Sequence, residues 1–291
     1  MMKSITDLNN MKITDSHVHF WNLSRLDYPW LKDVPQINVN SELAEFEKAT
    51  QLIAIEAIVF VQCECLANQY EQEIAYVTAL AAMDDRIKAI IPYFPLCNKN
   101  IGKPLNSLTQ NSLIKGIRRL EEEPVSLYMQ PQFLANLKIL KEYNLSFDLG
   151  IKSHQMEATI RLLDKVPDNR YILDHMAKPP IKSGGFNTWY KQLKEIAAHP
   201  NVYCKLSGLT TEANWDSWNM DDLEPYFAAA LELFGVNRLC FGSDWPVVNL
   251  GSNYANWLGT ALDLCVDLNS EDKRRIFHQN TLDFYQIDRK A

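Results

Sequence analysis

The sequence lacks the features that mark membrane, secreted and zinc-ribbon proteins. None of its apolar runs approaches the roughly 18 residues that are needed to span a bilayer. Residues 1–10 are polar and have no apolar core of the kind found in signal peptides. The six cysteines are scattered and no two have C-x-x-C spacing, so neither a structural zinc site nor a disulfide framework is indicated. We therefore expect a cytoplasmic protein with free, mostly buried thiols.

Positive charge is also scarce. The 29 basic residues are outnumbered by 36 acidic ones, which gives a net charge of −7. Because nucleic acids bind to basic surfaces, they are not expected partners. The sequence contains neither the G-x-G-x-x-G fingerprint of dinucleotide-binding domains nor the G-x-S-x-G elbow of serine hydrolases. The 47% of apolar residues is the composition of an ordinary globular protein, and none of these absences argues against a small substrate.

The sequence does contain a regular alternation of short apolar runs and longer amphipathic stretches. Several of the runs are apolar almost throughout, as expected of strands that are covered on both faces. This alternation predicts a parallel sheet, and eight strands favour closure into an α/β fold of the (β/α)8 TIM-barrel type over an open sheet. The predicted strands are residues 11–20, 57–63, 87–94, 116–120, 145–151, 171–176, 202–207 and 239–244.

The clearest helices lie between these strands, at residues 68–83, 131–143, 155–166, 189–199 and 221–234. Asn68 opens a pattern typical of a helix cap, Pro131 is suited to a first helical turn, and Gly235 follows a predicted C-terminus. There is no internal repeat or linker, so we expect one domain over residues 1–291, with residues 1–10 as a flexible extension. The long aromatic segment 22–40 is predicted to cover one end of the barrel.

His17 and His19 form an H-x-H pair at the carboxyl end of the first predicted strand. Side chains two positions apart on a strand point to the same face, so both imidazoles share one face with Asp15. Barrel enzymes place their active sites at the carboxyl ends of the strands. Two neutral imidazoles at this place suit the binding of a metal ion or the polarisation of a carbonyl group, although two unrelated histidines would give the same pattern.

Asp244 ends the eighth predicted strand. In a closed barrel this strand pairs with the first at about 4.8 Å, so we expect Asp244 beside His17 and His19. A carboxylate at this position can take a proton from water or ligate a metal. The structural alternative is a cap or turn aspartate, because the residue stands directly before Trp-Pro.

Two other strand ends carry adjacent polar residues. Neighbouring side chains on a strand point to opposite faces, so only one of each pair is expected in the lumen. For the sixth strand we choose His175, and assign Asp174 to packing or to support of the site. For the fourth strand Arg118, which shares a face with Gly116, is the candidate to hold a carboxylate or a lactone oxygen. One of the two arginines, Arg118 or Arg119, is expected to be a surface charge, and the sequence does not fix which of them faces the lumen.

Further polar and aromatic residues near the strand ends are candidates for contacts with a substrate. Lys178 follows the sixth strand, and Gln62 and Glu64 lie near the end of the second. His154 follows the fifth strand and suits a ligand as well as a loop residue. Trp30, in the long loop, could stack on a sugar ring, although most such aromatic residues only pack.

Several segments of the chain resemble one known family. In order they are Asp-Ser-His-Val-His-Phe-Trp (15–21), Asp-Tyr-Pro-Trp (27–30), Asp-His-Met-Ala-Lys-Pro-Pro (174–180), Lys-Leu-Ser-Gly-Leu-Thr-Thr-Glu-Ala (205–213) and Phe-Gly-Ser-Asp-Trp-Pro-Val (241–247), with a looser match at 119–124. They resemble the branch of the amidohydrolase superfamily that contains the sugar lactonases and the pyrone-dicarboxylate lactonases.

The resemblance implies a distorted (β/α)8 barrel that hydrolyses lactones. It assigns the catalytic centre to His17, His19, His175 and Asp244, and places Arg118 near the substrate. The same four residues would ligate a divalent ion, with zinc expected if one is bound. Many amidohydrolases bridge two metals with a carbamylated lysine at the end of the fourth strand, where this chain has arginine, and some similar lactonases work without metal. We therefore expect one divalent ion or none, without a strict requirement.

The sequence thus predicts a hydrolase that opens an aldonolactone, such as L-fuconolactone or L-rhamnonolactone, with water activated by Asp244. The segment 211–215 favours a sugar lactone over a pyrone. A metal-dependent decarboxylase on a similar barrel is one alternative, and a catalytically inactive barrel that serves as a binding module is another. The expected partner is a small cyclic ester, with no membrane or nucleic acid involved. A homodimer is compatible with the sequence, which does not fix the oligomeric state.

Overall fold

The computed structural model describes residues 11–288. The predicted flexible extension at residues 1–10 lies outside this range. Eight parallel strands follow one another along the chain, and each overlaps one of the predicted apolar runs. They are β1 (Ile13–Val18), β2 (Ile55–Val61), β3 (Ile87–Ile91), β4 (Gly116–Leu120), β5 (Ser146–Gly150), β6 (Tyr171–Leu173), β7 (Val202–Leu206) and β8 (Leu239–Phe241).

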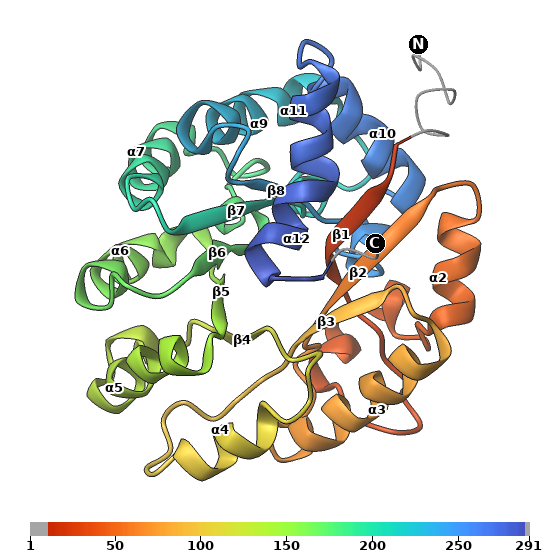
Figure 1. Cartoon of the computed structure of the whole chain (residues 1–291). Helices are drawn as coiled ribbons and strands as arrows, with labels where there is room; N and C mark the ends of the chain where they lie inside the picture. The colour runs from red at the N-terminus through yellow and green to blue at the C-terminus, as the bar shows by residue number, and fades with distance from the viewer. Residues whose placement is uncertain (1–10, 289–291) are drawn as a thin grey trace.

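The strands pair in chain order but form two sheets. One sheet has the order β1-β2-β3 and the other the order β4-β5-β6-β7-β8. Single parallel bridges join the sheets at both seams, between Ile90 and Ile114 and between Val18 and Trp245. The second seam is reinforced by two backbone hydrogen bonds, in which Asp244 N–H donates to the carbonyl of His17 (2.9 Å) and His19 N–H donates to that of Trp245 (2.8 Å). The strands therefore follow one another around a ring, as in a distorted TIM-type barrel (Figure 1).

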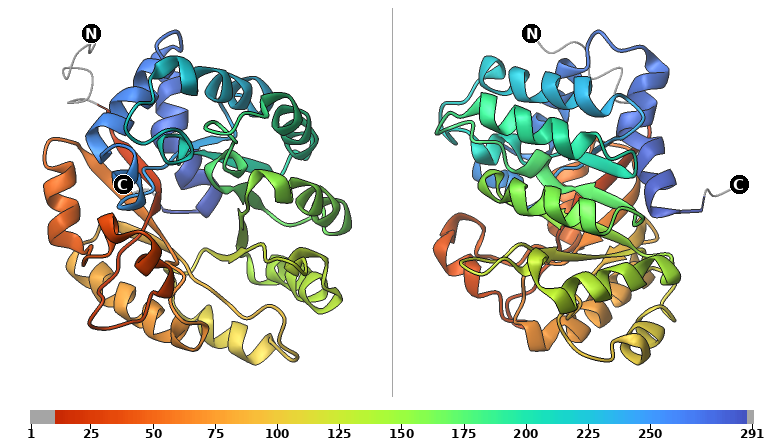
Figure 2. Two further views of the ribbon diagram at one scale, coloured as in Figure 1. Left: turned by 180° about the vertical axis from the view of Figure 1, so that it is seen from behind. Right: turned by 90° about the vertical axis from the view of Figure 1, so that its left-hand side faces the viewer.

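Helices surround this ring of strands in all views (Figures 1 and 2). The longer ones are α2 (Leu43–Thr50), α3 (Tyr70–Met83), α5 (Pro131–Ile139), α6 (Met156–Lys165), α7 (Phe186–Ala197), α9 (Met220–Phe234) and α10 (Tyr254–Leu264). Shorter helices are α4 (Gly102–Leu108), α8 (Leu209–Glu212), α11 (Ser270–Arg274) and α12 (Asn280–Tyr285). The five predicted helices are all present. The predicted cap at Asn68 is wrong, because this residue lies in a 3-10 turn and no side chain caps α3.

The short helix α12 covers the amino-terminal ends of the strands. The side-chain amide of Asn280 donates to the carbonyls of Val236 and Leu239, which stand before and at the start of β8. Figure 1 shows α12 in front of the strands, near the middle of the ring. Its apolar side chains pack against strand residues in one buried cluster, which we call the apolar floor: Ala57, Val59, Val61, Ala89, Ile91, Ile172, Cys240, Leu282, Phe284, Tyr285 and Ile287. The floor closes the ring at this end.

The long aromatic loop lies at the opposite, carboxyl end of the strands. It contains two 3-10 turns, Pro29–Asp33 and Pro35–Ile37. The indole N–H of Trp30 donates to the carbonyl of Cys63, just beyond β2 (2.8 Å). The loop is thereby fastened beside the end of the barrel where the paired histidines lie. Within residues 11–288, no helix is both long and apolar enough to cross a membrane.

Candidate active site

The two histidines of β1 and the aspartate that follows β8 meet at the carboxyl end of the ring. The Nε2 atoms of His17 and His19 are 3.2 Å apart. Asp244 Oδ1 lies 3.2 Å from Nε2 of His19 and 3.7 Å from Nε2 of His17. Side-chain alternation along β1 puts both rings on the lumen face, and the backbone bonds at the seam bring Asp244 to the same level. The sequence prediction placed these three groups together, and the structure does so.

His175 joins this group from the end of β6. Its ring centroid lies 4.5 Å from that of His17, and its Nδ1 lies 2.8 Å from the hydroxyl of Ser207. Gly208 makes room for the ring, since a Cβ at that position would stand 2.9 Å from the Cβ of His175. Burial lowers the pKa of His175 to about 4, although Asp244 acts in the opposite direction. His175 is therefore neutral at pH 7.

The residues after β6 do not continue the alternation of a strand. His175, Met176, Ala177 and Lys178 all have φ between 49° and 60°, which makes a left-handed turn. Asp174 is fully buried and its Oδ1 lies 3.4 Å from Nδ1 of His17. The expectation that only one of the pair 174–175 enters the lumen is therefore wrong, because strand geometry ends at Leu173. Asp174 contacts both His17 and Arg118, and its support of the site stays a prediction.

The adjacent arginines of β4 point in different directions. The guanidinium of Arg118 lies inside the ring, with Nη1 3.3 Å from Asp174 and 3.4 Å from Nε2 of His17. Its Nη2 donates to the carbonyl of Gln62 (2.5 Å). Arg119 stacks over the ring of Tyr93 at 4.4 Å and is only 7% exposed. Arg118 is thus the arginine that faces the lumen, and the expectation that one of the two is a surface charge is wrong, because both are buried.

Three buried residues below the histidines were missed by sequence reasoning. Lys205 of β7 lies 2.6 Å from Asp148 of β5, 2.9 Å from Asp174 and 3.1 Å from Nδ1 of His17. Tyr285 of α12 donates to the same carboxylate of Asp148 (2.6 Å). The available signal was a charged residue inside each of two runs that are otherwise apolar. A lysine in the middle of a strand covered on both faces must point into the lumen and needs a buried partner.

The candidate substrate residues lie at different depths. Gln62 is buried and its side-chain amide donates to the carboxylate of Glu64, which is half-buried. Trp30 and Lys178 are also half-buried, and both lie close to the carboxyl ends of strands. His154 is exposed and pairs with Glu123 at 2.8 Å. The backbone carbonyl of Gln62 accepts from Arg118 beside the histidine cluster, whereas His154 lies at the surface outside the cluster.

The protonation states follow from burial and from these neighbours. Burial raises the pKa of Asp244, but the surrounding imidazoles of His175, His19 and His17 lower it more, so the pKa lies below its usual value. Burial and then the Lys205 ammonium hold the pKa of His17 well below its usual range. At pH 7 the centre therefore contains an ionised carboxylate beside the neutral imidazoles of His17 and His175.

The donor set fits a divalent ion. Zinc bonds to imidazole nitrogen at about 2.0–2.1 Å in tetrahedral geometry, which sets the donors about 3.3 Å apart. The 3.2 Å separations of His19 Nε2 from His17 Nε2 and from Asp244 Oδ1 match this spacing. Donor atoms of His17, His175 and Asp244 also lie within 4.8 Å of one another. The Nδ1 of His19 lies 2.8 Å from the carbonyl of Val61, so its ring proton is on that side and Nε2 is free to bind a metal.

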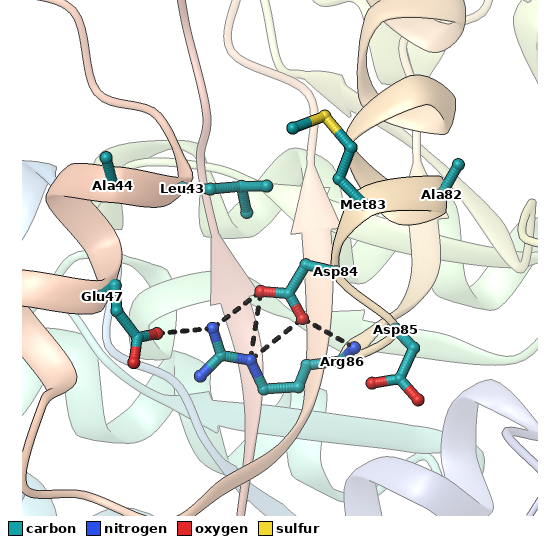
Figure 3. A pocket seen from close by; sticks show the side chains of 8 residues that line it. All are labelled: Leu43, Ala44, Glu47, Ala82, Met83, Asp84, Asp85 and Arg86. Carbon is teal, nitrogen blue, oxygen red and sulfur yellow. Dashed lines mark hydrogen bonds and ion pairs between the residues drawn. The ribbon is translucent and has the colours of Figure 1, made fainter.

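A separate surface depression lies between α2 and the end of α3 (Figure 3). Its one cationic side chain, Arg86, donates hydrogen bonds to Asp84 and Glu47. Because Arg86 directly precedes β3, this depression is at the amino-terminal end of the strands, away from the histidines. It does not contribute to the candidate site.

Comparison with known proteins identifies the family. The chain matches the amidohydrolase family over residues 14–287 and belongs to it. It is 30% identical over 288 residues to an L-fucono-1,5-lactonase of Burkholderia ambifaria, which covers 95% of this chain and 96% of that protein. An L-rhamnono-gamma-lactonase of Scheffersomyces stipitis is 25% identical, with 96% of this chain and 100% of that protein covered. The family resemblance noted in the sequence is thereby confirmed.

A solved structure supports the same assignment. An amidohydrolase from Burkholderia multivorans, determined with bound zinc, has a TM-score of 0.87 and 25% sequence identity. The alignment covers 95% of this chain and 99% of that one. The ring of strands and its surrounding helices are therefore those of an amidohydrolase barrel over nearly the whole length.

Proposed function

We propose that this protein hydrolyses an aldonolactone, opening the ring by direct attack of water. The observation that carries the proposal is the contact of one ionised carboxylate, Asp244, with the buried imidazoles of His17, His19 and His175 at the carboxyl end of the barrel. Relatives that span the whole chain and are named for L-fucono-1,5-lactone and L-rhamnono-gamma-lactone support the choice of substrate class.

In the proposed reaction Asp244 takes a proton from water while the water oxygen attacks the lactone carbonyl carbon. The developing negative charge on the carbonyl oxygen is stabilised by Arg118 and the neighbouring imidazoles. The bond to the ring oxygen then breaks, and Asp244 returns the proton to the departing alkoxide. The product is an open-chain hydroxy acid, and no covalent intermediate with the protein is formed.

His17, His19, His175 and Asp244 are the residues that would hold a divalent ion, zinc first among them. Such an ion, when bound, supplies Lewis-acid polarisation of the carbonyl and lowers the pKa of bound water. We propose that no metal is strictly required.

The residues proposed to contact the substrate lie at different depths in the barrel. Arg118 donates to the reacting carbonyl oxygen. At the end of β2, the amide of Gln62 donates to sugar hydroxyls and accepts from them, and the carboxylate of Glu64 accepts from them. Lys178 and Trp30 border the same end of the barrel, and Trp30 offers a face on which a sugar ring can stack. His154, which is exposed, contacts substrate only if a larger ligand extends beyond the mouth.

The test is a panel of aldonolactones followed by acid release, corrected for spontaneous hydrolysis, with and without chelator. For Asp244→Asn we expect kcat/KM to fall by roughly 10²–10⁴-fold, because proton transfer by a positioned base is lost. The matched control is Asp267→Asn at an exposed turn, which should behave like wild type.

Near-normal turnover by Asp244→Asn contradicts the base assignment. Release of carbon dioxide from aromatic acids, with no acid release from any lactone, would favour the decarboxylase alternative. Thermal stabilisation by lactones without turnover would favour a binding module.

A further inference from the structure

Lys205 is the most unusual charge in the barrel, because its side chain is fully buried beneath the histidines. Its ammonium faces three groups, Asp148 Oδ2 at 2.6 Å, Asp174 Oδ1 at 2.9 Å and Nδ1 of His17 at 3.1 Å. An ammonium has three N–H donors and no acceptor. At its contact with Nδ1 of His17, Lys205 therefore donates and the imidazole nitrogen accepts.

This contact decides where the ring proton of His17 lies. The neutral imidazole has one N–H, and a ring that accepts at Nδ1 carries its proton on Nε2. Nε2 faces the reaction centre, 3.2 Å from Nε2 of His19 and 3.4 Å from Nη1 of Arg118, a donor that lies farther from the ring than the Lys205 ammonium does. His19 can accept there, because its own proton is on Nδ1, which donates to the carbonyl of Val61. The three groups thus form one consistent chain of donors and acceptors.

A histidine that ligates a metal through Nε2 requires the opposite arrangement, in which Nδ1 carries the proton and donates to a carboxylate or carbonyl. Asp174 is the carboxylate that could accept it, but its Oδ1 is 3.4 Å from Nδ1. Lys205 is closer, at 3.1 Å, and within normal hydrogen-bond range. Lys205 and Asp174 therefore compete for the same nitrogen.

We propose that Lys205 is a positioning residue that keeps the proton of His17 on Nε2, so that His17 acts as a hydrogen-bond donor toward the substrate carbonyl and is held back from ligating a metal. Without Lys205, the ring proton of His17 moves to Nδ1 and is donated in a hydrogen bond to Asp174, so that Nε2 is free to ligate a metal. The tautomer rests on the geometry alone, whereas its use in opening a lactone rests on the proposed function.

The surroundings keep Lys205 charged and in place. Burial lowers its pKa, but Asp148 and Asp174 raise it more, so the pKa lies above its usual value. Tyr285 donates to Asp148 from below, and its ring lies 5.7 Å from the ammonium. Burial raises the pKa of Asp148 to about 6 against the effect of Lys205, so the pair is best studied at pH 8, where both groups are ionised.

The decisive variant removes one positive and one negative charge together, Lys205→Met with Asp148→Asn, because an unpaired buried carboxylate would be strongly destabilising. Asp174 remains to receive the proton of His17. The matched control is Tyr285→Phe, which removes a hydrogen bond to Asp148 and leaves the contact between Lys205 and His17 intact.

The first measurement is the ring ¹⁵N spectrum of histidine-labelled, metal-free protein at pH 8, with His17→Gln used for assignment. We expect the His17 proton on Nε2 in wild type and in Tyr285→Phe, and on Nδ1 in the double variant. The second measurement is zinc affinity by competition with a chromophoric chelator. We expect the double variant to bind zinc at least about tenfold more tightly, since loss of the hydrogen-bond partner of a metal-ligating histidine typically changes metal affinity 10–100-fold.

A wild-type His17 with its proton on Nδ1 would overturn the proposal, as would a double variant with unchanged tautomer and zinc affinity. If the double variant does not fold, as judged by circular dichroism, the wild-type spectrum alone decides. Neither measurement uses a lactone. Failure of the lactone panel would therefore contradict the proposed function and leave this proposal standing.

Discussion

The two ends of the barrel lumen are built from the same strands but differ in chemistry. At the amino-terminal end, the apolar floor packs alanine, valine and isoleucine side chains of the strands against α12. Toward the carboxyl end, the strands contribute buried charges and imidazoles, among them Arg118, Asp174, Lys205 and Asp244. At β6 the change of character takes place within two residues, between Ile172 and Asp174.

The two ends of the lumen contribute differently to the stability of the fold. Burial of apolar side chains stabilises the fold. Burial of charges costs free energy even when they are paired, so the charged end is weak evidence for stability. Its buried ions are nevertheless arranged in contact, as Lys205 is with Asp148 and Asp174. The floor therefore provides stability, and the charged end carries the proposed chemistry.

Leu282→Ala is the strongest test of this difference between the two ends of the lumen. Leu282 of α12 is buried in the floor, so its truncation should lower the free energy of unfolding by about 2–5 kcal/mol. The kcat/KM of the folded protein should stay at the wild-type value. Urea denaturation and the lactone assay measure the two effects. Leu52→Ala is the control, because Leu52 is 79% exposed and its loss should cost under about 0.5 kcal/mol.

Glu73→Gln tests the cost of burying a charge through the pH dependence of stability. Glu73 is buried and accepts from the N–H of Cys63 just after β2, and burial raises its pKa to about 7 from 4.5. Between these values the folded protein keeps a proton that the unfolded chain has lost, so wild-type stability falls as pH rises from 4.5 to 7.

Glu73→Gln has no ionisable carboxyl at this position, so its stability does not fall in this way as the pH rises. The stability of Glu73→Gln relative to wild type should therefore increase between pH 5 and pH 8, by about 3 kcal/mol. Denaturation curves at the two pH values measure the change. Glu71→Gln, exposed on the same helix, serves as the control. An equal difference at both pH values would show that Glu73 is ionised throughout.

Ala177→Gly has the smallest expected effect and tests the left-handed turn after β6. Ala177 has a φ of 60°, a conformation that costs an L-residue about 1–2 kcal/mol, and glycine adopts it freely. After the added entropy of the unfolded chain, we expect a net gain in stability of roughly 0.5–1 kcal/mol. Ala75→Gly in the interior of α3 should instead cost about 1 kcal/mol. Thermal unfolding compares the two, and a loss at Ala177 would show that the turn carries no strain.

The sequence allowed the strands and the core of the site to be predicted for physical reasons. Apolar runs mark strands that are covered on both faces, and ring closure follows from their number. Closure in turn brings Asp244 beside His17 and His19. These inferences need only local periodicity and one topological step.

Other parts of the site could not be predicted in this way. The left-handed turn after Leu173 cancels the alternation rule, so Asp174 and His175 enter the lumen together. Lys205 of β7 and Asp148 of β5 meet although β6 lies between their strands; they are 57 residues apart in sequence, and no local pattern links them. Their pairing depends on the stagger of β5 and β7, which the sequence does not reveal.

The seam between β1 and the residues after β8 also has a consequence for assembly. His17 comes from the first strand and Asp244 follows the last, so the proposed base and its imidazoles become neighbours only when the chain has closed on itself. The candidate site therefore joins the two ends of the fold. We expect a chain whose ring is incomplete to lack the proposed activity.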